Sequence, residues 1–207
     1  MLIVKVKICG ITNLADAQAA IEMGADLLGF NFYPKSPRYI QPQAAMEIIS
    51  KLPAFIDTVG VFVNPSPEQI KEMITDGQLN WVQLHGDETP QFCESLLSLS
   101  VRTMKALRIR GPEDIKRAEN YYTDAILLDA YRPDKYGGTG TNFDWNIIGH
   151  ITRRVFLAGG INPENAQKAV ELGVYGIDVC SGIESAPGKK DHKKMKKLFE
   201  NIEHLKG

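Results

Sequence analysis

The segment IVKVKICGIT (residues 3–12) is the stretch that decides how this chain is expected to fold. Its first six residues, Ile3–Ile8, are mostly β-branched, which predicts a strand. A short turn follows at Cys9-Gly10, and Thr12 is the expected N-cap of a helix that runs to Met23. Because the turn lacks the GxGxxG spacing of a dinucleotide-binding fold, the segment disfavours an open doubly wound sheet.

The same strand-then-helix unit recurs along the rest of the chain, where short apolar runs alternate with helical stretches. The further strands are predicted at Ala25–Phe32, Thr58–Val63, Trp81–Leu84, Val101–Ala106, Ala125–Asp129, Val155–Ala158 and Gly176–Val179. The helices that follow them are predicted at Gln43–Lys51, Pro65–Ile74, Glu88–Leu97, Pro112–Asn120, Trp145–His150, Pro163–Leu172 and Lys189–His204.

Eight such units in 207 residues, about 26 residues each, favour a parallel sheet with right-handed crossovers. Closing the eight units gives a barrel, so we predict an α/β fold: a (β/α)8 TIM barrel with a parallel eight-stranded core. No linker, charge block or low-complexity tract divides the chain, and residues 1–207 are therefore expected to form a single domain.

The composition excludes several classes of partner. The formal net charge is −1, from 24 basic and 25 acidic residues, which gives no electrostatic footprint for nucleic acid or an anionic membrane. No apolar run approaches the length of a membrane span, and the first residues lack a signal-peptide cleavage site. The three cysteines form no CxxC pair, which fits a reducing, cytoplasmic location. A monomer is the default expectation, and a homodimer is the alternative.

Two residues at predicted strand ends are candidates for acid–base chemistry, since active sites of such barrels lie at the carboxyl ends of the strands. Cys9 follows the first strand and precedes a helix N-terminus, which would favour a thiolate, although a small buried hydrophobe is the alternative. Asp129 ends the apolar run that begins at Ala125, and it is either a loop cap or an acid whose pKa burial would raise. Cys93 is expected to be structural, and Cys180 to support its loop.

Three glycine clusters follow the last three strands and predict a phosphate site. They are Gly137-Gly138-Thr139-Gly140, Gly159-Gly160-Ile161-Asn162 and Ser181-Gly182-Ile183. Glycine lets backbone N–H groups approach an anion closely, and the loops after strands seven and eight are the usual phosphate site of a barrel. The alternative is ordinary turn chemistry.

Two further residues are substrate-binding candidates. Arg38 lies after Ser36-Pro37 in the loop that follows the second strand, outside the expected core, where its guanidinium could bind a carboxylate bidentately or remain solvated. His85 ends the fourth strand and either contacts substrate or caps the strand. The sequence has neither an HExxH motif nor paired CxxC motifs, so no metal site is predicted.

These motifs resemble those of the phosphoribosylanthranilate isomerases. The resemblance spans nearly the whole chain in order. It rests on Lys7–Thr12, Gly29-Phe30, Ser36–Arg38, Gly60–Asn64, Gln83–Gly86, Leu128-Asp129, Gly137–Gly140, Phe143–Trp145, Leu157–Ile161, Asn165, Asp178-Val179 and Ser181–Glu184. One departure is Cys180, where a small polar residue is expected.

The resemblance implies an Amadori rearrangement of N-(5-phosphoribosyl)anthranilate in tryptophan biosynthesis, with no cofactor. It implies that Asp129 is the general acid, that Cys9 is the general base and that Arg38 binds the anthranilate carboxylate. It places the phosphate at the late glycine loops. The candidate substrate-binding residues, besides Arg38, are therefore Gly138, Gly140, Gly159, Gly160, Ser181 and Gly182, together with His85 and Asp178, whose roles the sequence leaves open. Two alternatives remain. One is the related histidine-pathway isomerase, in which two aspartates would serve as the acid and the base. The other is a non-catalytic phosphoribosyl-binding barrel.

Overall fold

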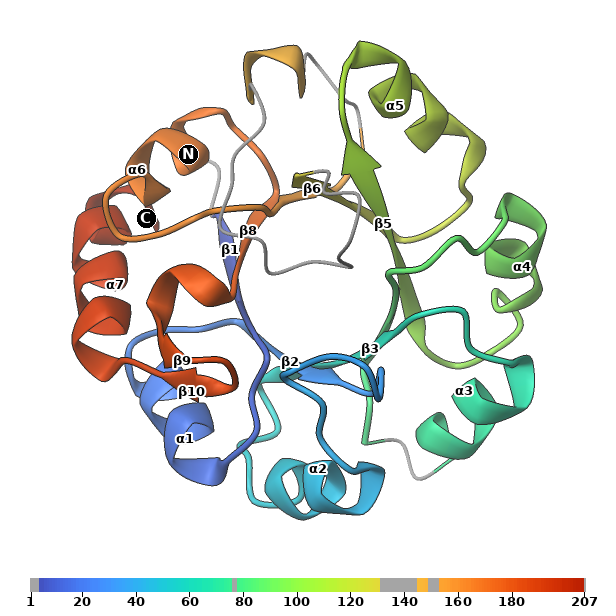
Figure 1. Cartoon of the computed structure of the whole chain (residues 1–207), viewed down its shortest axis with the longest axis horizontal. Helices are drawn as coiled ribbons and strands as arrows, with labels where there is room; N and C mark the ends of the chain where they lie inside the picture. The colour runs from blue at the N-terminus through green and yellow to red at the C-terminus, as the bar shows by residue number, and fades with distance from the viewer. Residues whose placement is uncertain (1–3, 76–77, 131–144, 149–152, 207) are drawn as a thin grey trace.

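Eight short apolar runs form a closed barrel of parallel strands in the computed structural model, which describes residues 4–75, 78–130, 145–148 and 153–206. The strands are β1 (Lys5–Cys9), β2 (Leu27–Asn31), β3 (Asp57–Phe62), β4 (Trp81–Leu84), β5 (Arg102–Ile109), β6 (Ala125–Ala130), β7 (Val155–Leu157) and β8 (Gly176–Val179). Each strand pairs with the next in the chain, and β8 pairs with β1 to close the barrel (Figure 1). The predicted (β/α)8 barrel is confirmed.

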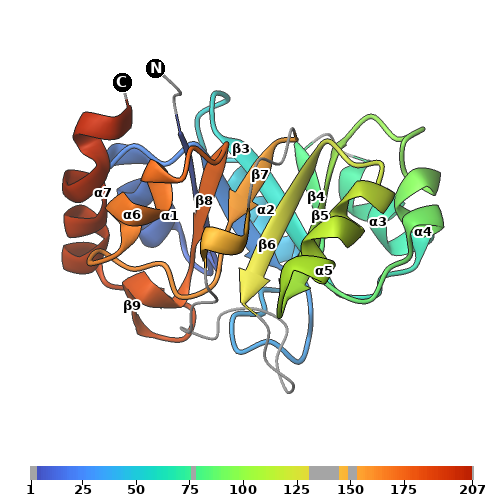
Figure 2. The same ribbon diagram turned by 90° about the horizontal axis from the view of Figure 1, so that it is seen from above.

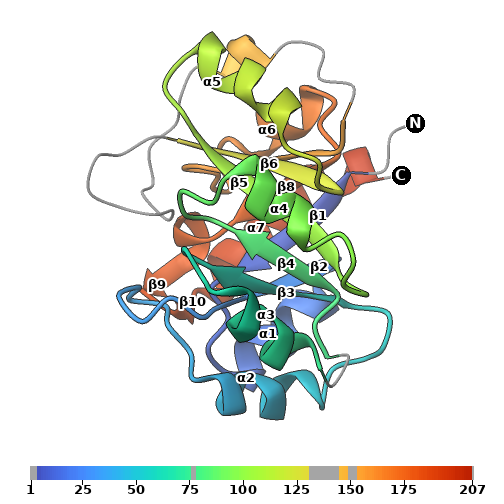
Figure 3. The same cartoon turned by 90° about the vertical axis from the view of Figure 1, so that its right-hand side faces the viewer.

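The helices form a ring around the strands (Figure 1). They are α1 (Leu14–Glu22), α2 (Pro42–Ile49), α3 (Pro67–Ile74), α4 (Pro90–Ser95), α5 (Pro112–Lys116), α6 (Ala166–Glu171) and α7 (His192–Lys206). Short 3-10 turns lie at η1 (Arg117–Asn120), η2 (Trp145–Ile148) and η3 (Ser181–Ile183). Proline occupies the first turn of α2, α3, α4 and α5, where its missing N–H costs nothing. Figure 3 shows α3, α4 and α5 over the outside of the neighbouring strands.

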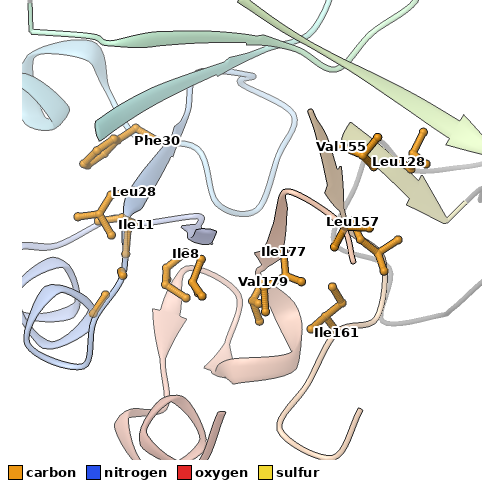
Figure 4. Packing of buried hydrophobic residues seen from close by; sticks show 14 of the residues in the cluster. Ile8, Ile11, Leu28, Phe30, Leu128, Val155, Leu157, Ile161, Ile177 and Val179 are labelled. Carbon is orange, nitrogen blue, oxygen red and sulfur yellow. The ribbon is translucent and has the colours of Figure 1, made fainter. Parts of the chain in front are cut away.

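Side chains along each strand alternate between the barrel interior and the layer under the helices. In β6, Ile126 and Leu128 belong to the large outer core, part of which is drawn in Figure 4, whereas Ala125 and Leu127 belong to a smaller cluster inside the barrel. By the same alternation Asp129 faces inward. The polar residues that end the strands therefore gather inside one mouth of the barrel.

The loops after the strands gather at one end of the molecule. Figure 2 shows β9 (Glu184–Ala186) at the end to which the β6 arrow points, with both chain termini at the opposite end. Strand β9 pairs with β10 (Lys189–Lys190) in an antiparallel hairpin. The expectation that a helix begins at Lys189 is therefore wrong. The backbone N–H of Lys190 donates to Asp16 and its ammonium to Glu184, which holds this segment in the hairpin.

The start of α1 also differs from the expectation. Asn13, not Thr12, is the N-cap, because its side chain accepts from the N–H of Asp16. The Thr12 hydroxyl instead donates to the carbonyl of Gly188, 176 residues further along the chain. A long-range partner thus displaces the local capping role.

Two further boundaries shift for local reasons. Helix α6 begins at Ala166 rather than Pro163, because the Asn162 side chain accepts from the N–H groups of Glu164 and Asn165 and forms a turn first. Strand β5 continues to Ile109, which pairs with Ala130 of β6. None of the helices in the described ranges combines the length and apolar character that a membrane span requires.

Candidate active site

Strand alternation brings the predicted acid and base into one cavity at the carboxyl ends of the strands. Cys9 ends β1, Asp129 lies near the end of β6, and both face inward beside Asp178 of β8. The cavity has a volume of about 510 Å³. Small phosphosugars need a site of this size, since ligand pockets measure roughly 300–1,000 Å³.

Most of the predicted site residues line this cavity. They are Cys9, Arg38, His85, Asp129, Gly159, Gly160, Asp178 and Ser181. Gly182 directly follows Ser181 in η3. Gly138 and Gly140 lie outside the described residues. The structure therefore brings together side chains from β1, β6 and β8 with the loops after β2, β4 and β7, which are far apart in the sequence.

The Cys9 thiol lies among groups that favour its ionised form. A hydrogen bond from the Cys180 thiol lowers the pKa of Cys9 well below its usual value, against the opposing effect of burial, and the positive charges of Lys7 and Lys190 lower it further. The Lys190 ammonium also donates to the Cys9 carbonyl. From the sequence, the N-terminus of the following helix was expected to favour the Cys9 thiolate. In the structure, the groups that lower the pKa of Cys9 are a second thiol and two lysines.

Lys7 forms a fully buried ion pair beneath the cavity. Its ammonium lies 2.8 Å from Asp178 Oδ1, and its side chain has no exposed surface. Burial alone would lower the pKa of Lys7, but the charges of Asp178 and Cys9 outweigh it and raise the pKa. Burial raises the pKa of Asp178 to about 6 despite the lysine, and the neighbouring Cys9 charge adds to this rise. At neutral pH the pair is therefore ionised, with Lys7 shared between Asp178 and Cys9.

Asp129 is positioned by two linked side chains, Gln83 in β4 and His85 directly after it. His85 Nε2 lies 3.2 Å from Asp129 Oδ2, and Gln83 Nε2 lies 2.9 Å from His85 Nδ1. With the Gln83 amide donating to Nδ1, a neutral imidazole carries its proton on Nε2 and donates it to Asp129. Asp129 itself is 2% exposed. His85 thus both lines the cavity and orients the carboxyl group.

Arg38 is half-buried rather than solvated, although it lies in a loop. Its side chain is 11% exposed, and its guanidinium binds Glu184 through Nε and Nη2, at 2.6 to 3.0 Å. Glu184 also accepts from Lys190 at 2.9 Å. Burial would lower the pKa of Arg38, but the hydrogen bonds to Glu184 outweigh it and raise the pKa. Within the described residues no acceptor contacts Nη1, so one edge of the fork remains available to a ligand.

The loops after β7 and β8 meet at the cavity rim. Gly159 and Gly160 have φ angles of +85° and +70°, which favour glycine. A Cβ at Gly182 would lie 2.0 Å from the Ile161 carbonyl oxygen, so glycine alone lets the two loops approach this closely. Ser181 begins the short turn η3 at the same rim. The arrangement brings two glycine-containing loops and a hydroxyl together on one side of the cavity.

Sequence reasoning missed four residues of this site: Lys7, Gln83, Glu184 and Lys190. Strand parity could have found two of them, because Lys7 lies two residues before Cys9 and Gln83 two residues before His85, on the same face. Nothing local marks Lys190, which was expected in a helix, and only the hairpin brings it to Cys9.

Comparisons with known proteins match this chain, over nearly its whole length, to one enzyme family. A family model described as N-(5'phosphoribosyl)anthranilate (PRA) isomerase matches residues 6–201. The N-(5'-phosphoribosyl)anthranilate isomerase of Trichodesmium erythraeum is 47% identical over 225 residues, covering 97% of this chain and 98% of the relative.

Two solved structures are similarly close. The first holds monomers generated from the dimeric enzyme of this name from Thermotoga maritima. It has a TM-score of 0.87 and 43% identity, and the match covers 98% of this chain and all of that one. The second is a phosphoribosyl anthranilate isomerase in complex with reduced 1-(o-carboxyphenylamino)-1-deoxyribulose 5-phosphate. It has a TM-score of 0.84 and 42% identity over the same shares.

Proposed function

Because this chain belongs to the N-(5'-phosphoribosyl)anthranilate isomerase family, it is an isomerase of tryptophan biosynthesis, and we propose that Cys9 and Asp129 carry its acid–base chemistry. The reaction is the rearrangement of N-(5-phosphoribosyl)anthranilate to 1-(2-carboxyphenylamino)-1-deoxyribulose 5-phosphate. The observation that carries the assignment is that an acid and a base, from β6 and β1, line one cavity with a guanidinium and a glycine-rich rim.

Two proton transfers suffice for this chemistry. Asp129 protonates the ring oxygen of the sugar, and the ring opens to an imine. Cys9 then removes the proton from C2, and the resulting enolamine tautomerises to the ketone. One proton is delivered and one is taken, so a single acid and a single base can run the reaction without a metal or a redox cofactor.

The surroundings of each group support its role. The hydrogen bond from Cys180 and the nearby Lys7 and Lys190 charges lower the pKa of Cys9, which favours the thiolate that a base requires. His85 occupies Oδ2 of Asp129, and Oδ1 would carry the proton toward the sugar. Asp178 holds Lys7 beside Cys9 and lines the cavity, where its carboxylate would accept from a sugar hydroxyl.

The two ends of the substrate have separate binding groups. Arg38 would bind the anthranilate carboxylate through the edge that Glu184 does not use. The phosphate would bind to backbone N–H groups of Gly159, Gly160, Ser181 and Gly182, with Gly138 and Gly140 completing the site. A phosphate handle supplies binding energy remote from the reacting carbons.

The same proposal extends to the context of the enzyme. We expect residues 1–207 to act as one barrel domain in the cytoplasm, as a monomer or as a homodimer. A dimeric form exists for the Thermotoga maritima relative. Light scattering of the purified chain separates the two states.

A fluorescence assay with freshly prepared phosphoribosylanthranilate tests the function. Wild type should turn over, and Cys9→Ala and Asp129→Asn should each lose about 10²–10⁴-fold in kcat, the value of one positioned proton-transfer group. Cys93→Ala is the matched control, because Cys93 is fully buried in α4 away from the cavity, and it should keep wild-type turnover. Near-normal turnover of Cys9→Ala would refute the mechanism. The doubly phosphorylated substrate of the histidine pathway, assayed alongside, should not be converted.

Anion competition tests the placement of the phosphate. Inorganic phosphate or sulfate should compete with substrate, and Gly182→Ala should weaken both, since its Cβ has no room beside Ile161. If the Gly182→Ala protein folds and binds the anion normally, the phosphate does not bind beside Gly182.

A further inference from the structure

Cys9 ends β1, and Cys180 directly follows the neighbouring strand β8. Lys7 pairs in register with Asp178 and Ile8 with Val179, and Cys9 and Cys180 are the residues that follow these last partners. Ile8 and Val179 belong to the outer core, whereas Cys9 and Cys180 line the cavity. Adjacent strands lie about 4.8 Å apart, within the Cα separation of about 4.4–6.8 Å that a disulfide requires.

The backbone around Cys9 allows the second sulfur to come close. Gly10 follows Cys9 with a φ of +78°, and a Cβ there would lie 3.2 Å from the Cys180 sulfur. Both cysteines line the substrate cavity, and Cys9 is 8% exposed. A small oxidant that enters the cavity therefore meets both sulfurs at once.

The two thiols differ in how readily they ionise. The Cys180 thiol has one proton and two acceptors within reach, the Cys9 sulfur and Glu184 Oε1 at 3.9 Å. The second contact is at the limit for a sulfur donor, and Glu184 already accepts from Arg38 and Lys190, so we assign the proton to the bond with Cys9. This bond lowers the pKa of Cys9 and raises that of Cys180. Ionisation is therefore favoured at Cys9 and disfavoured at Cys180.

We propose that Cys9 and Cys180 form a dithiol that hydrogen peroxide converts to a disulfide, which switches the enzyme off by consuming its base. The loss of activity rests on the proposed role of Cys9, whereas the disulfide rests on the placement of the two sulfurs in the cavity and does not depend on that role. This assigns Cys180, the residue that departs from the family pattern, to a modification site.

The oxidation balances in two steps. The Cys9 thiolate attacks one oxygen of hydrogen peroxide, the O–O bond breaks, and hydroxide leaves and takes up a proton to become water. Cys9 is now a sulfenic acid, oxidised by two electrons. The Cys180 sulfur then attacks the Cys9 sulfur, the S–S bond forms, the S–O bond breaks, and a second water leaves with the Cys180 proton. A dithiol reductant reverses the process by thiol–disulfide exchange.

Cys93 shows why the reaction is selective. It has no exposed surface, and burial raises its pKa to about 11, so it remains a thiol and is inaccessible. It is therefore the internal control for non-specific oxidation.

The test is to treat substrate-free enzyme with hydrogen peroxide, denature it in an alkylating agent and map the peptides without reduction. Wild type should lose two of its three free thiols and yield a linked Cys9–Cys180 peptide. Turnover should fall in proportion to the disulfide fraction, and dithiothreitol should restore it. Cys93→Ser should behave as wild type. Cys180→Ser, measured against its own untreated activity, should lose turnover irreversibly as Cys9 advances to the sulfinic acid.

Each other outcome counts against a defined part of the proposal. Wild type that retains three free thiols, or that acquires a Cys9 sulfinic acid without a disulfide, would overturn the dithiol. A disulfide that forms reversibly while turnover is unchanged would overturn the inactivation, and with it the assignment of Cys9 as the base.

Discussion

Two buried lysine–carboxylate pairs lie on opposite faces of the barrel wall, and their difference separates function from scaffold. Lys7 and Asp178 pair at 2.8 Å on the inner face, directly below Cys9. Lys105 and Glu88 pair at 2.6 Å on the outer face, between β5 and the helix layer. Both lysines are at most 1% exposed. In composition and burial the two pairs are nearly the same.

Their remaining contacts differ. The Lys105 ammonium donates to the carbonyls of Leu84 and Gly86 and to the Glu88 carboxylate. These three bonds use all three N–H groups of the ammonium. Glu88 also accepts from the backbone of Asn64 and so fastens the loop after β3 to the loop after β4. The Lys7 ammonium is instead shared with the reactive thiol. We infer that the outer pair, whose donors are all used, serves the scaffold, and that the inner pair, which leaves positive charge next to the proposed base, serves the chemistry.

The largest expected effect is on stability, at the outer pair. Lys105→Met leaves Glu88 buried without its cation, which should lower the free energy of unfolding by about 3–5 kcal/mol. Turnover of the folded protein should be unchanged, because the pair does not reach the cavity. Urea unfolding and kcat/KM below the transition measure the two. Lys116→Met, which removes an exposed ion pair with Glu113, is the control and should change stability little. A large loss of turnover in Lys105→Met would erase the contrast between the faces.

The next effect is on binding, at Arg38. Arg38→Ala should weaken substrate binding by about 2–3 kcal/mol, as loss of a charge-assisted pair does. Arg38→Lys keeps the charge without the planar fork and should recover part of it. Glu184 keeps Lys190 as a partner in both variants, so unfolding should change less than in Lys105→Met. KM and urea unfolding are the measurements, and a wild-type KM would remove Arg38 from the site.

The smallest expected effect is a change in pH dependence at the inner pair. As the proposed base, Cys9 must be deprotonated to act, and Lys7 helps to lower its pKa. Lys7→Met should raise that pKa and move the acid limb of kcat/KM to higher pH. At a pH below the limb, kcat/KM should fall about tenfold (~1.4 kcal/mol) for each pH unit by which the limb moves. Asp178, whose pKa is about 6, can take up a proton and remain buried neutral.

The alkaline plateau should return toward the wild-type value, which distinguishes a charge effect from a damaged fold. Lys105→Met should leave the limb in place. An unmoved limb in Lys7→Met would show that Cys180 and Lys190 set the state of Cys9 without Lys7.

The alternation of inward and outward side chains along each strand is the feature of the site that can be read from the sequence. The placement of Cys9 and Asp129 at inward strand ends follows from local alternation, and the same rule applied to Lys7 and Gln83 would have found two of the missed residues. The role of Arg38 was harder to predict, because its partner Glu184 lies 146 residues away and becomes a neighbour only when the barrel closes. The sequence also left open whether His85 contacts substrate or caps its strand. Its contact with Asp129, which lies 44 residues away, forms only in the folded barrel.

The sequence by itself determined the eight strand–helix units, the end of the barrel that carries the site, and the identity of the acid and base candidates. These follow from short-range signals: apolar periodicity, β-branched runs, and proline and glycine at element ends. The tertiary structure alone decided that Asn13 caps α1 because Thr12 bonds to Gly188, that Lys189–Lys190 pairs in a hairpin, and that Cys180 meets Cys9. Each of these depends on a partner from the other end of the chain, and the register between β1 and β8 is set only by closure of the barrel.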